Sequence, residues 1–205
     1  MNAMTDIERL EQLLTSRSVR WGDFVLASGK RSNLYVDARL TTMSPDGMVL
    51  IGKLGLETIE SAHWLPDSIG GLTLGAQPVA YAISHTSAGR TRPLRAFTVR
   101  KEAKAHGTGK RIEGPFKSGD RVVVIEDVIT TGKSALQAID AIKAEGGDII
   151  AVLAIVDRQE GGREIIEQNG YAVAALVTRD ALTSARSAAD DASASQESPQ
   201  PDGTS

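Results

Sequence analysis

The sequence has no cysteine, few aromatic residues and no long apolar run, and each absence excludes a class of protein. Without cysteine there is no disulfide, no thiolate nucleophile and no cysteine-ligated metal. Aromatic residues make up only 4 % of the chain, which argues against a surface that stacks nucleic-acid bases. No apolar run approaches the roughly 20 residues that cross a bilayer, and residues 1–14 lack the apolar block of a signal peptide. We therefore expect a cytoplasmic protein that binds no membrane and no nucleic acid.

The composition is otherwise that of an ordinary globular protein. The 205 residues are 41 % hydrophobic and 24 % charged, with a formal net charge of −3 and a pI near 5.7. Residues 183–205 differ, because they contain no aromatic side chain and no aliphatic one larger than alanine. Such a segment buries too little apolar surface to offset the entropy lost on ordering. We expect a single folded domain over residues 1–182 and a disordered tail over residues 183–205.

The folded part alternates predicted strands and helices. An N-terminal helix with an apolar face precedes two short strand candidates, 24–27 and 34–37, and Ser44-Pro45 marks the start of a further helix. Strands and helices then follow in alternation, an order that predicts a parallel sheet with right-handed crossovers. The predicted strands are 68–70, 94–99, 121–125, 149–156 and 172–177, and the predicted helices are 45–61, 78–84, 135–146 and 165–168.

The segment 122–134 carries the most specific chemical signal. Four apolar residues form a strand expected to be buried on both faces, and Glu126 and Asp127 follow at its carboxyl end, where open α/β sheets bind ligands. The loop 130–134 then places hydroxyls and backbone N–H groups at a helix N-terminus, which favours an anion. Carboxylates that accept hydrogen bonds from two vicinal hydroxyls, beside a loop that holds a phosphate, suit a ribose 5-phosphate.

Two other interpretations of this segment are weaker. Gly132-Lys133-Ser134 resembles the end of a nucleotide-binding P-loop, but that motif needs a glycine five residues before its Gly-Lys, where this chain has Asp127. The carboxylates of Glu126 and Asp127 could also do no more than cap the following helix. One carboxylate would suffice for a cap, so the adjacent pair favours a ligand.

These 13 residues resemble the signature of the type I phosphoribosyltransferases, which bind 5-phosphoribosyl-1-diphosphate. The resemblance implies an α/β fold with a central parallel sheet flanked by helices. It also implies a small N-terminal hood, residues 1 to about 40, over the carboxyl edge of a core formed by about 41–182. The two carboxylates would hold the ribose hydroxyls and the loop would hold the 5′-phosphate. The implied donor-binding residues here are Glu126, Asp127, Val128, Ile129, Thr130, Thr131, Gly132, Lys133 and Ser134.

A basic segment, Arg100–Arg111, follows a predicted strand. Its five Lys or Arg residues, one His and one Glu are by themselves typical of a solvated charged loop. Its order Arg-Lys-x-x-Lys-x-His-Gly resembles the catalytic flexible loop of the orotate phosphoribosyltransferases, which implies that it stabilises charge developing on the diphosphate leaving group. The resemblance assigns diphosphate binding to Arg100, Lys101, Lys104 and His106, and catalytic roles to Lys104, His106 and Asp127.

Three further segments resemble the same family. Residues 28–37 resemble its orotate-recognition hairpin, in which Tyr35 and Val36 would flank the pyrimidine. Residues 70–78 resemble its diphosphate loop, with Leu74 and Gly75 as donor contacts. Residues 157–160 resemble the segment whose arginine, here Arg158, meets the orotate carboxylate, and the resemblance makes Thr130 a second orotate contact. Taken alone, Arg158 is more typical of a salt bridge at a strand end, and it is the context of the other segments that favours a ligand role.

The chain departs from part of the family at two phosphate contacts. Ala27 and Gly75 stand where enterobacterial-type enzymes have lysine. Lys30, or backbone N–H groups of the Leu74–Gly75 loop, are the candidate replacements.

The implied reaction transfers the phosphoribosyl group to orotate, which produces orotidine 5′-monophosphate and diphosphate in pyrimidine biosynthesis. Mg²⁺ is the implied cofactor, held by donor oxygens with water-mediated contacts to Glu126 and Asp127. A homodimer with shared active sites is also implied. Two alternatives stay open: a phosphoribosyltransferase for another base, and a non-catalytic regulator that binds the donor. The hairpin and Arg158 favour orotate, and the basic segment 100–107 favours an enzyme over a regulator.

Overall fold

A computed structural model of the chain describes residues 3–25, 31–102 and 111–196. Its centre is a six-stranded sheet with the strand order β5-β4-β3-β6-β7-β8. Neighbouring strands are parallel except at the edge, where β5 runs antiparallel to β4. The predicted parallel sheet is therefore confirmed, and β5 is an addition, because two residues carry no recognisable period. The strands are β3 (Ser68–Leu72), β4 (Arg95–Val99), β5 (Ile112–Glu113), β6 (Arg121–Ile129), β7 (Asp148–Asp157) and β8 (Ala172–Thr178).

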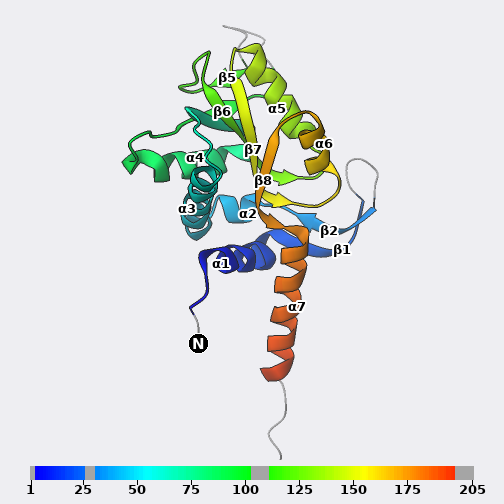
Figure 1. The fold of residues 1–205 in the computed structure, drawn as a ribbon. Coiled ribbons are helices and arrows are strands. Elements are labelled where there is room, and N and C mark those ends of the chain that lie inside the picture. Colours follow the sequence, from blue (N-terminus) through cyan, green and yellow to red (C-terminus); the bar gives the residue numbers. More distant parts are fainter. Residues whose placement is uncertain (1–2, 26–30, 103–110, 197–205) are drawn as a thin grey trace, which may run out of the picture.

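Helices cover both faces of this sheet (Figure 1). Successive residues of the central strands point to opposite faces. Val123 and Leu153 belong to one hydrophobic cluster, and Val122 and Val152 belong to another. Both clusters are fully packed, which explains why the central strands are continuously apolar. The helices on the first face are α3 (Pro45–Ser61) and α4 (Ala76–Thr86), and those on the second are α5 (Lys133–Ala144) and α6 (Gly162–Gln168).

The N-terminal residues form a small layer at the lower end of the sheet in Figure 1, which we call the hood. Its strands pair antiparallel from Val19 with Val36 to Val25 with Arg31. They lie earlier than the predicted 24–27 and 34–37, because this pairing recruits polar residues that have no alternating pattern. The hood consists of α1 (Asp6–Leu13), a π-helical segment (Leu14–Ser18), β1 (Val19–Val25) and β2 (Arg31–Val36), and the short α2 (Arg39–Thr42) follows it.

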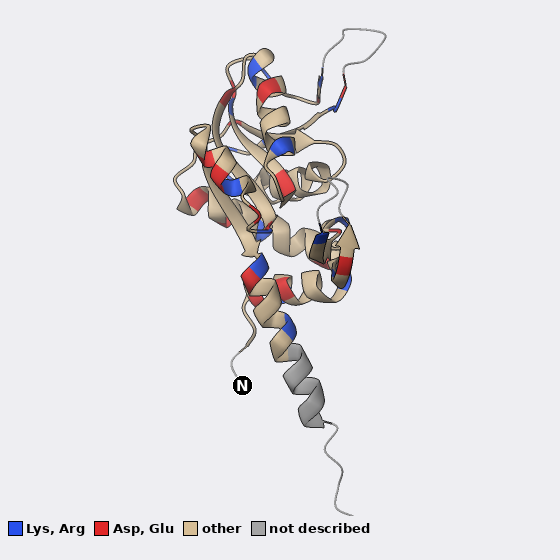
Figure 2. Ribbon diagram, turned by 90° about the vertical axis from the view of Figure 1, so that its right-hand side faces the viewer, with Lys and Arg blue, Asp and Glu red and all other residues tan. Residues whose placement is uncertain are grey.

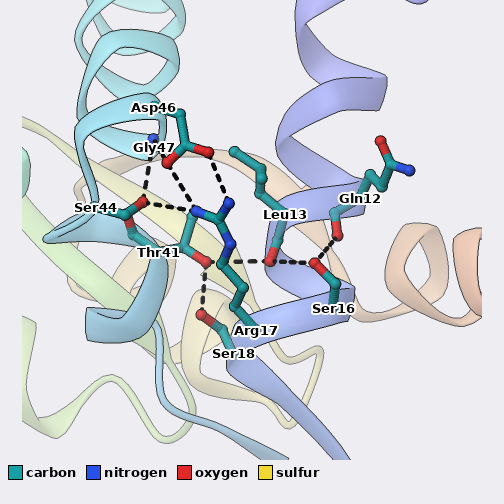
Figure 3. A network of polar contacts seen from close by, with 9 residues as sticks. All are labelled: Gln12, Leu13, Ser16, Arg17, Ser18, Thr41, Ser44, Asp46 and Gly47. Carbon is teal, nitrogen blue, oxygen red and sulfur yellow. Dashed lines mark hydrogen bonds and ion pairs between the residues drawn. The ribbon is translucent and has the colours of Figure 1, made fainter.

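A polar network joins the hood to the start of α3 (Figure 3). Arg17 donates from Nη1 and Nη2 to the two carboxylate oxygens of Asp46, at 2.7 and 2.8 Å. The hydroxyls of Ser18 and Thr41 share a buried 2.7 Å hydrogen bond. Ser44 caps α3 as predicted, because its Oγ accepts from the Gly47 N–H at 3.2 Å and proline follows at the first helical position.

The C-terminal segment differs from the expectation of disorder. Helix α7 (Arg179–Gln196) continues through the first part of the expected tail and extends away from the body past α1 (Figure 1). The structure has a helix at residues 183–196, where the composition predicts disorder, because alanine-rich sequence forms a helix locally and the buried Leu182 anchors its first turns. Residues 197–205 of that tail lie outside the described part. No helix among the described residues combines the length and apolar composition needed to span a membrane.

Candidate active site

A cleft of about 550 Å³ opens where the hood meets the carboxyl ends of β3, β6 and β7. Open α/β sheets bind ligands at this edge because loops and helix N-termini converge there. Residues from five separate sequence segments meet in it, including most of those that the sequence singled out. The lining residues are Tyr35, Val36, Asp37, Ala38, Arg39, Leu72, Thr73, Leu74, Gly75, Lys101, Glu126, Asp127, Val128, Thr130, Ser134 and Arg158.

The two adjacent carboxylates come from β6 itself. The sequence predicted that this strand ends at residue 125, whereas it continues to Ile129. It is longer because Glu126 and Val128 still pair with Ala154 and Val156 of β7. Glu126 is only 7 % exposed. Burial, and next the charge of Asp127, raise the pKa of Glu126 well above its ordinary value.

The loop after β6 forms the second part of the site. Gly132 has φ +75°, and a Cβ there would meet the Gly162 carbonyl oxygen, so the loop packs directly on the start of α6. Helix α5 then begins at Lys133. A smaller cavity of about 60 Å³ lies against this turn and connects the predicted phosphate loop with Glu126. It is lined by Glu126, Val128, Ile129, Thr130, Thr131, Gly132, Lys133, Ser134 and Ala135.

Arg158, at the end of β7, ties the core to the hood. Its backbone N–H donates to the Ile129 carbonyl at 3.0 Å, and its side chain is 6 % exposed. Nη2 donates to Ser32 Oγ and to the Leu34 carbonyl, both at 2.9 Å, and to Glu160 Oε1 at 2.6 Å. The buried Nε has no hydrogen-bond partner among the described residues. Arg158 therefore both forms a salt bridge at the strand end and lines the cleft.

The basic segment is divided by the structure. Lys101 lines the cleft, and its charge opposes the rise in the pKa of Glu126. Arg100 does not line the cleft, because its Nη1 donates to Glu113 Oε1 at 3.3 Å across the β4–β5 edge. Lys104 and His106 lie outside the described residues.

The cleft also contains residues that the sequence did not single out. Asp37 and Arg39 follow the hood strand β2, Leu72 ends β3, and Thr73 follows it. The peptide bond between Thr73 and Leu74 is cis. The resemblance of the hairpin to an orotate-recognition segment was a signal for Asp37, whereas Arg39 lies beyond any motif and is brought in only by the turn into α2. Ala27 and Lys30 lie outside the described residues.

Comparison with known proteins identifies the relatives of this chain. No family model matches it. Orotate phosphoribosyltransferase of Aquifex aeolicus is 47 % identical over 176 residues, which are 84 % of this chain and 95 % of that protein. The enzyme of the same name from Rhodopirellula baltica is 40 % identical over 181 residues, 86 % of this chain and 94 % of that protein. The chain belongs to the orotate phosphoribosyltransferase family.

Solved structures of this family share the fold. The crystal structure of Mycobacterium tuberculosis orotate phosphoribosyltransferase in complex with 5-phospho-alpha-D-ribosyl 1-diphosphate is 38 % identical, with a TM-score of 0.74 over 87 % of this chain and 99 % of that one. The resemblance read from residues 122–134, the hairpin and the diphosphate loop is thus confirmed at the level of the family, and the fold is that of a type I phosphoribosyltransferase. The roles of individual residues stay predictions.

Proposed function

We propose that this protein transfers the phosphoribosyl group of 5-phosphoribosyl-1-diphosphate to orotate. The observation that supports this most is the composition of the 550 Å³ cleft between the hood and the sheet. Glu126, Thr130 and Ser134 of the donor signature face Tyr35 and Arg158, the residues expected to hold the pyrimidine. A site for a phosphoribosyl donor and a site for a planar anionic base are therefore one continuous space.

In the proposed reaction, orotate N1 forms a bond to C1 of the ribose while the C1–O bond to diphosphate breaks. The diphosphate leaves with the electron pair of that bond, so positive charge builds up on the ribose ring and negative charge on the leaving group. Glu126 and Asp127 would hold the two ribose hydroxyls, and Lys101 would face the departing diphosphate. Lys104 and His106 of the basic segment would complete this stabilisation. Orientation and charge stabilisation then supply the catalysis without a covalent enzyme intermediate.

Arg158 is the proposed ligand of the orotate carboxylate. A guanidinium suits a planar carboxylate because it donates two parallel hydrogen bonds. Nη2 is already used by the hood and by Glu160, whereas the buried Nε lacks a partner among the described residues. An unpartnered buried donor is costly, and a bound carboxylate would satisfy it.

Mg²⁺ is the proposed cofactor. Within the described part of the chain no three acidic or histidine side chains gather as a metal cage. The carboxylates of Glu126 and Asp127 at the cleft suit a cation that keeps several waters and is held mainly by donor oxygens. Bound there, Mg²⁺ would neutralise charge on the diphosphate.

We also propose that the protein works as a homodimer. The family resemblance supports this, as do exposed apolar side chains beside the cleft. Leu40, Met43 and Leu74 are 50, 51 and 61 % exposed, and together they border a hollow next to the cleft rim. Apolar side chains gathered in this way commonly mark a protein interface. Light scattering at micromolar protein concentration would give twice the 21.7 kDa chain mass for a dimer, and the chain mass itself would refute the dimer.

A spectrophotometric assay tests the proposed function. Purified protein with orotate, 5-phosphoribosyl-1-diphosphate and Mg²⁺ should lose the ultraviolet absorbance of orotate, and adenine or guanine should not be consumed. Consumption of a purine instead, or of no base at all, would reject the proposal. Arg158→Lys should raise the KM for orotate roughly tenfold, because lysine has no counterpart of the Arg158 Nε–H donor. Arg163→Lys, a change of the same kind in a surface ion pair with Glu167, is the matched control.

A further inference from the structure

The charges that line the cleft leave one cation without a role. The charged lining residues are three acids and three cations: Asp37, Glu126, Asp127, Arg39, Lys101 and Arg158. The proposed function uses Arg158 for the orotate carboxylate and Lys101 for the diphosphate. Figure 2 shows Lys and Arg interspersed with Asp and Glu along the ribbon. Arg39 is the cation of the cleft lining that has no assigned role.

Arg39 lies on the hood side of the cleft, opposite β6. It is the first residue of α2 and faces the same space as Thr73, Leu74 and Gly75 of the diphosphate loop. It also borders the neighbouring hollow together with Leu74, which places it on the rim beside this loop. The negative charge of Asp127, across the cleft, contributes to raising the pKa of Arg39, although the main cause is its hydrogen bond to Asp37.

Asp37 holds the Arg39 guanidinium in one orientation. Nε donates to Asp37 Oδ1 at 2.8 Å and Nη2 donates to Oδ2 at 2.9 Å, so one edge of the guanidinium is fully engaged. Nη1 makes no hydrogen bond within the described residues, and the side chain is 46 % exposed. A preoriented guanidinium with a free, accessible edge is well suited to phosphate oxygens.

Gly75 lies directly against the Asp127 side chain. A Cβ at Gly75 would overlap the Asp127 carboxylate. The lysine that some members of the family have at residue 75 would therefore require the Asp127 side chain to move. Arg39 brings a positive charge to the same loop from the other side of the cleft.

We propose that Arg39, positioned by Asp37, binds the diphosphate group of the phosphoribosyl donor and the free diphosphate that the reaction releases. This inference rests on the proposed function for the identity of the donor. Arg39 would then supply, from α2, the positive charge that some members of the family obtain from a lysine at residue 75.

The test compares Arg39→Gln with Arg17→Gln. Arg17 is the matched control, because it also makes a bidentate ion pair, with Asp46, is 40 % exposed and lies outside the cleft (Figure 3). Calorimetric binding of inorganic diphosphate with Mg²⁺, the KM for each substrate and thermal unfolding would be measured for each variant. Arg39→Gln should raise the diphosphate Kd and the donor KM roughly tenfold, with the orotate KM within about twofold. Arg17→Gln should leave both unchanged.

Two further variants separate binding from a structural effect. Arg39→Lys keeps the charge and should recover part of the donor affinity, while Asp37→Asn should weaken diphosphate binding less than Arg39→Gln does. Equal diphosphate affinity for wild type and Arg39→Gln, or an equal loss in Arg17→Gln, would overturn the assignment. A wild-type protein that binds diphosphate through Arg39 but consumes no orotate would instead reject the proposed function and keep the role of Arg39.

Discussion

At the scale of the residue, Glu126 shows how the site is built at the expense of stability. The side chain is buried inside a sheet strand beside a second carboxylate, and burial followed by the charge of Asp127 raises its pKa. A buried carboxylate that weakens the folded state when ionised is typical of a functional site. The sequence singled out both acids, and their role in ligand binding stays a prediction. It missed that they lie within β6, because the extension depends on pairing with β7.

The pH dependence of stability follows from this pKa. Because the folded-state pKa of Glu126 is raised, its contribution to stability is fully present below the unfolded pKa and is lost as the pH rises through the folded value. Glu126→Gln removes that loss. We expect the variant to exceed the wild type in unfolding free energy by about 1 kcal/mol at pH 8, the usual size of a single-substitution effect, and to match it at pH 4.

Urea unfolding at the two pH values measures this difference. Glu57→Gln, an exposed substitution on α3, is the control and should change nothing. If the unfolding free energies of Glu126→Gln and the wild type differed by the same amount at pH 8 and pH 4, the raised pKa of Glu126 would be contradicted. Catalytic activity should fall in Glu126→Gln, because an amide cannot serve as the same acceptor for ribose hydroxyls.

At the scale of the element, α7 is the clearest departure from the sequence-based expectation. Composition predicted disorder from residue 183 because no large apolar side chain follows. The helix nevertheless continues, since its hydrogen bonds are local and its first turns are held by the body. Arg179 Nη2 donates to Asn33 Oδ1 of β2 at 2.7 Å, and the Arg186 guanidinium lies 5.2 Å from the ring centre of Trp21. Contacts across more than 140 residues of sequence separation leave no local pattern to read.

Truncation separates the anchored part of α7 from the rest. A chain that ends at Ala188 should keep the unfolding free energy of the full chain within about 0.5 kcal/mol. A chain that ends at Leu182 loses the Arg186–Trp21 contact and should be less stable by about 1 kcal/mol. Arg186→Ala in the full chain should reproduce most of that loss. Equal stability of the two truncated chains, measured by urea unfolding, would show that Arg186 does not contribute.

At the scale of the whole molecule, the hood and the core share one hydrophobic cluster. Leu10, Leu14 and Leu34 of the hood are fully buried, and the same cluster contains Ile51 of α3 and Leu153 of β7. Two layers that share a packed core should unfold together. The single domain expected over residues 1–182 stays a prediction, and this cluster is its physical basis.

Cooperative unfolding can be followed in each layer, because the two tryptophans lie one in each. Trp21 is in β1 of the hood, and Trp64 follows α3 of the core. In the Trp21→Phe and Trp64→Phe variants the fluorescence transitions should coincide. Leu34→Ala should lower the unfolding free energy from both transitions by about 2–5 kcal/mol, because it leaves a cavity in the shared core. Val49→Ala should change neither value, because Val49 is 70 % exposed. Two separate transitions would show that the hood is an independent unit.

The sequence by itself determined the α/β class, the succession of core strands and helices along the chain and, through the resemblance of its motifs, the family. The class and the elements rest on short-range information, namely apolar runs and helix caps, and the family rests on motifs such as residues 122–134. Tertiary structure alone decided the rest. It extended β6 through Glu126, paired Arg100 with Glu113 away from the cleft, and brought Arg39 of α2 beside Leu74 and Gly75. Each of these depends on contacts between residues distant in sequence, and such contacts form only when strands and layers pack.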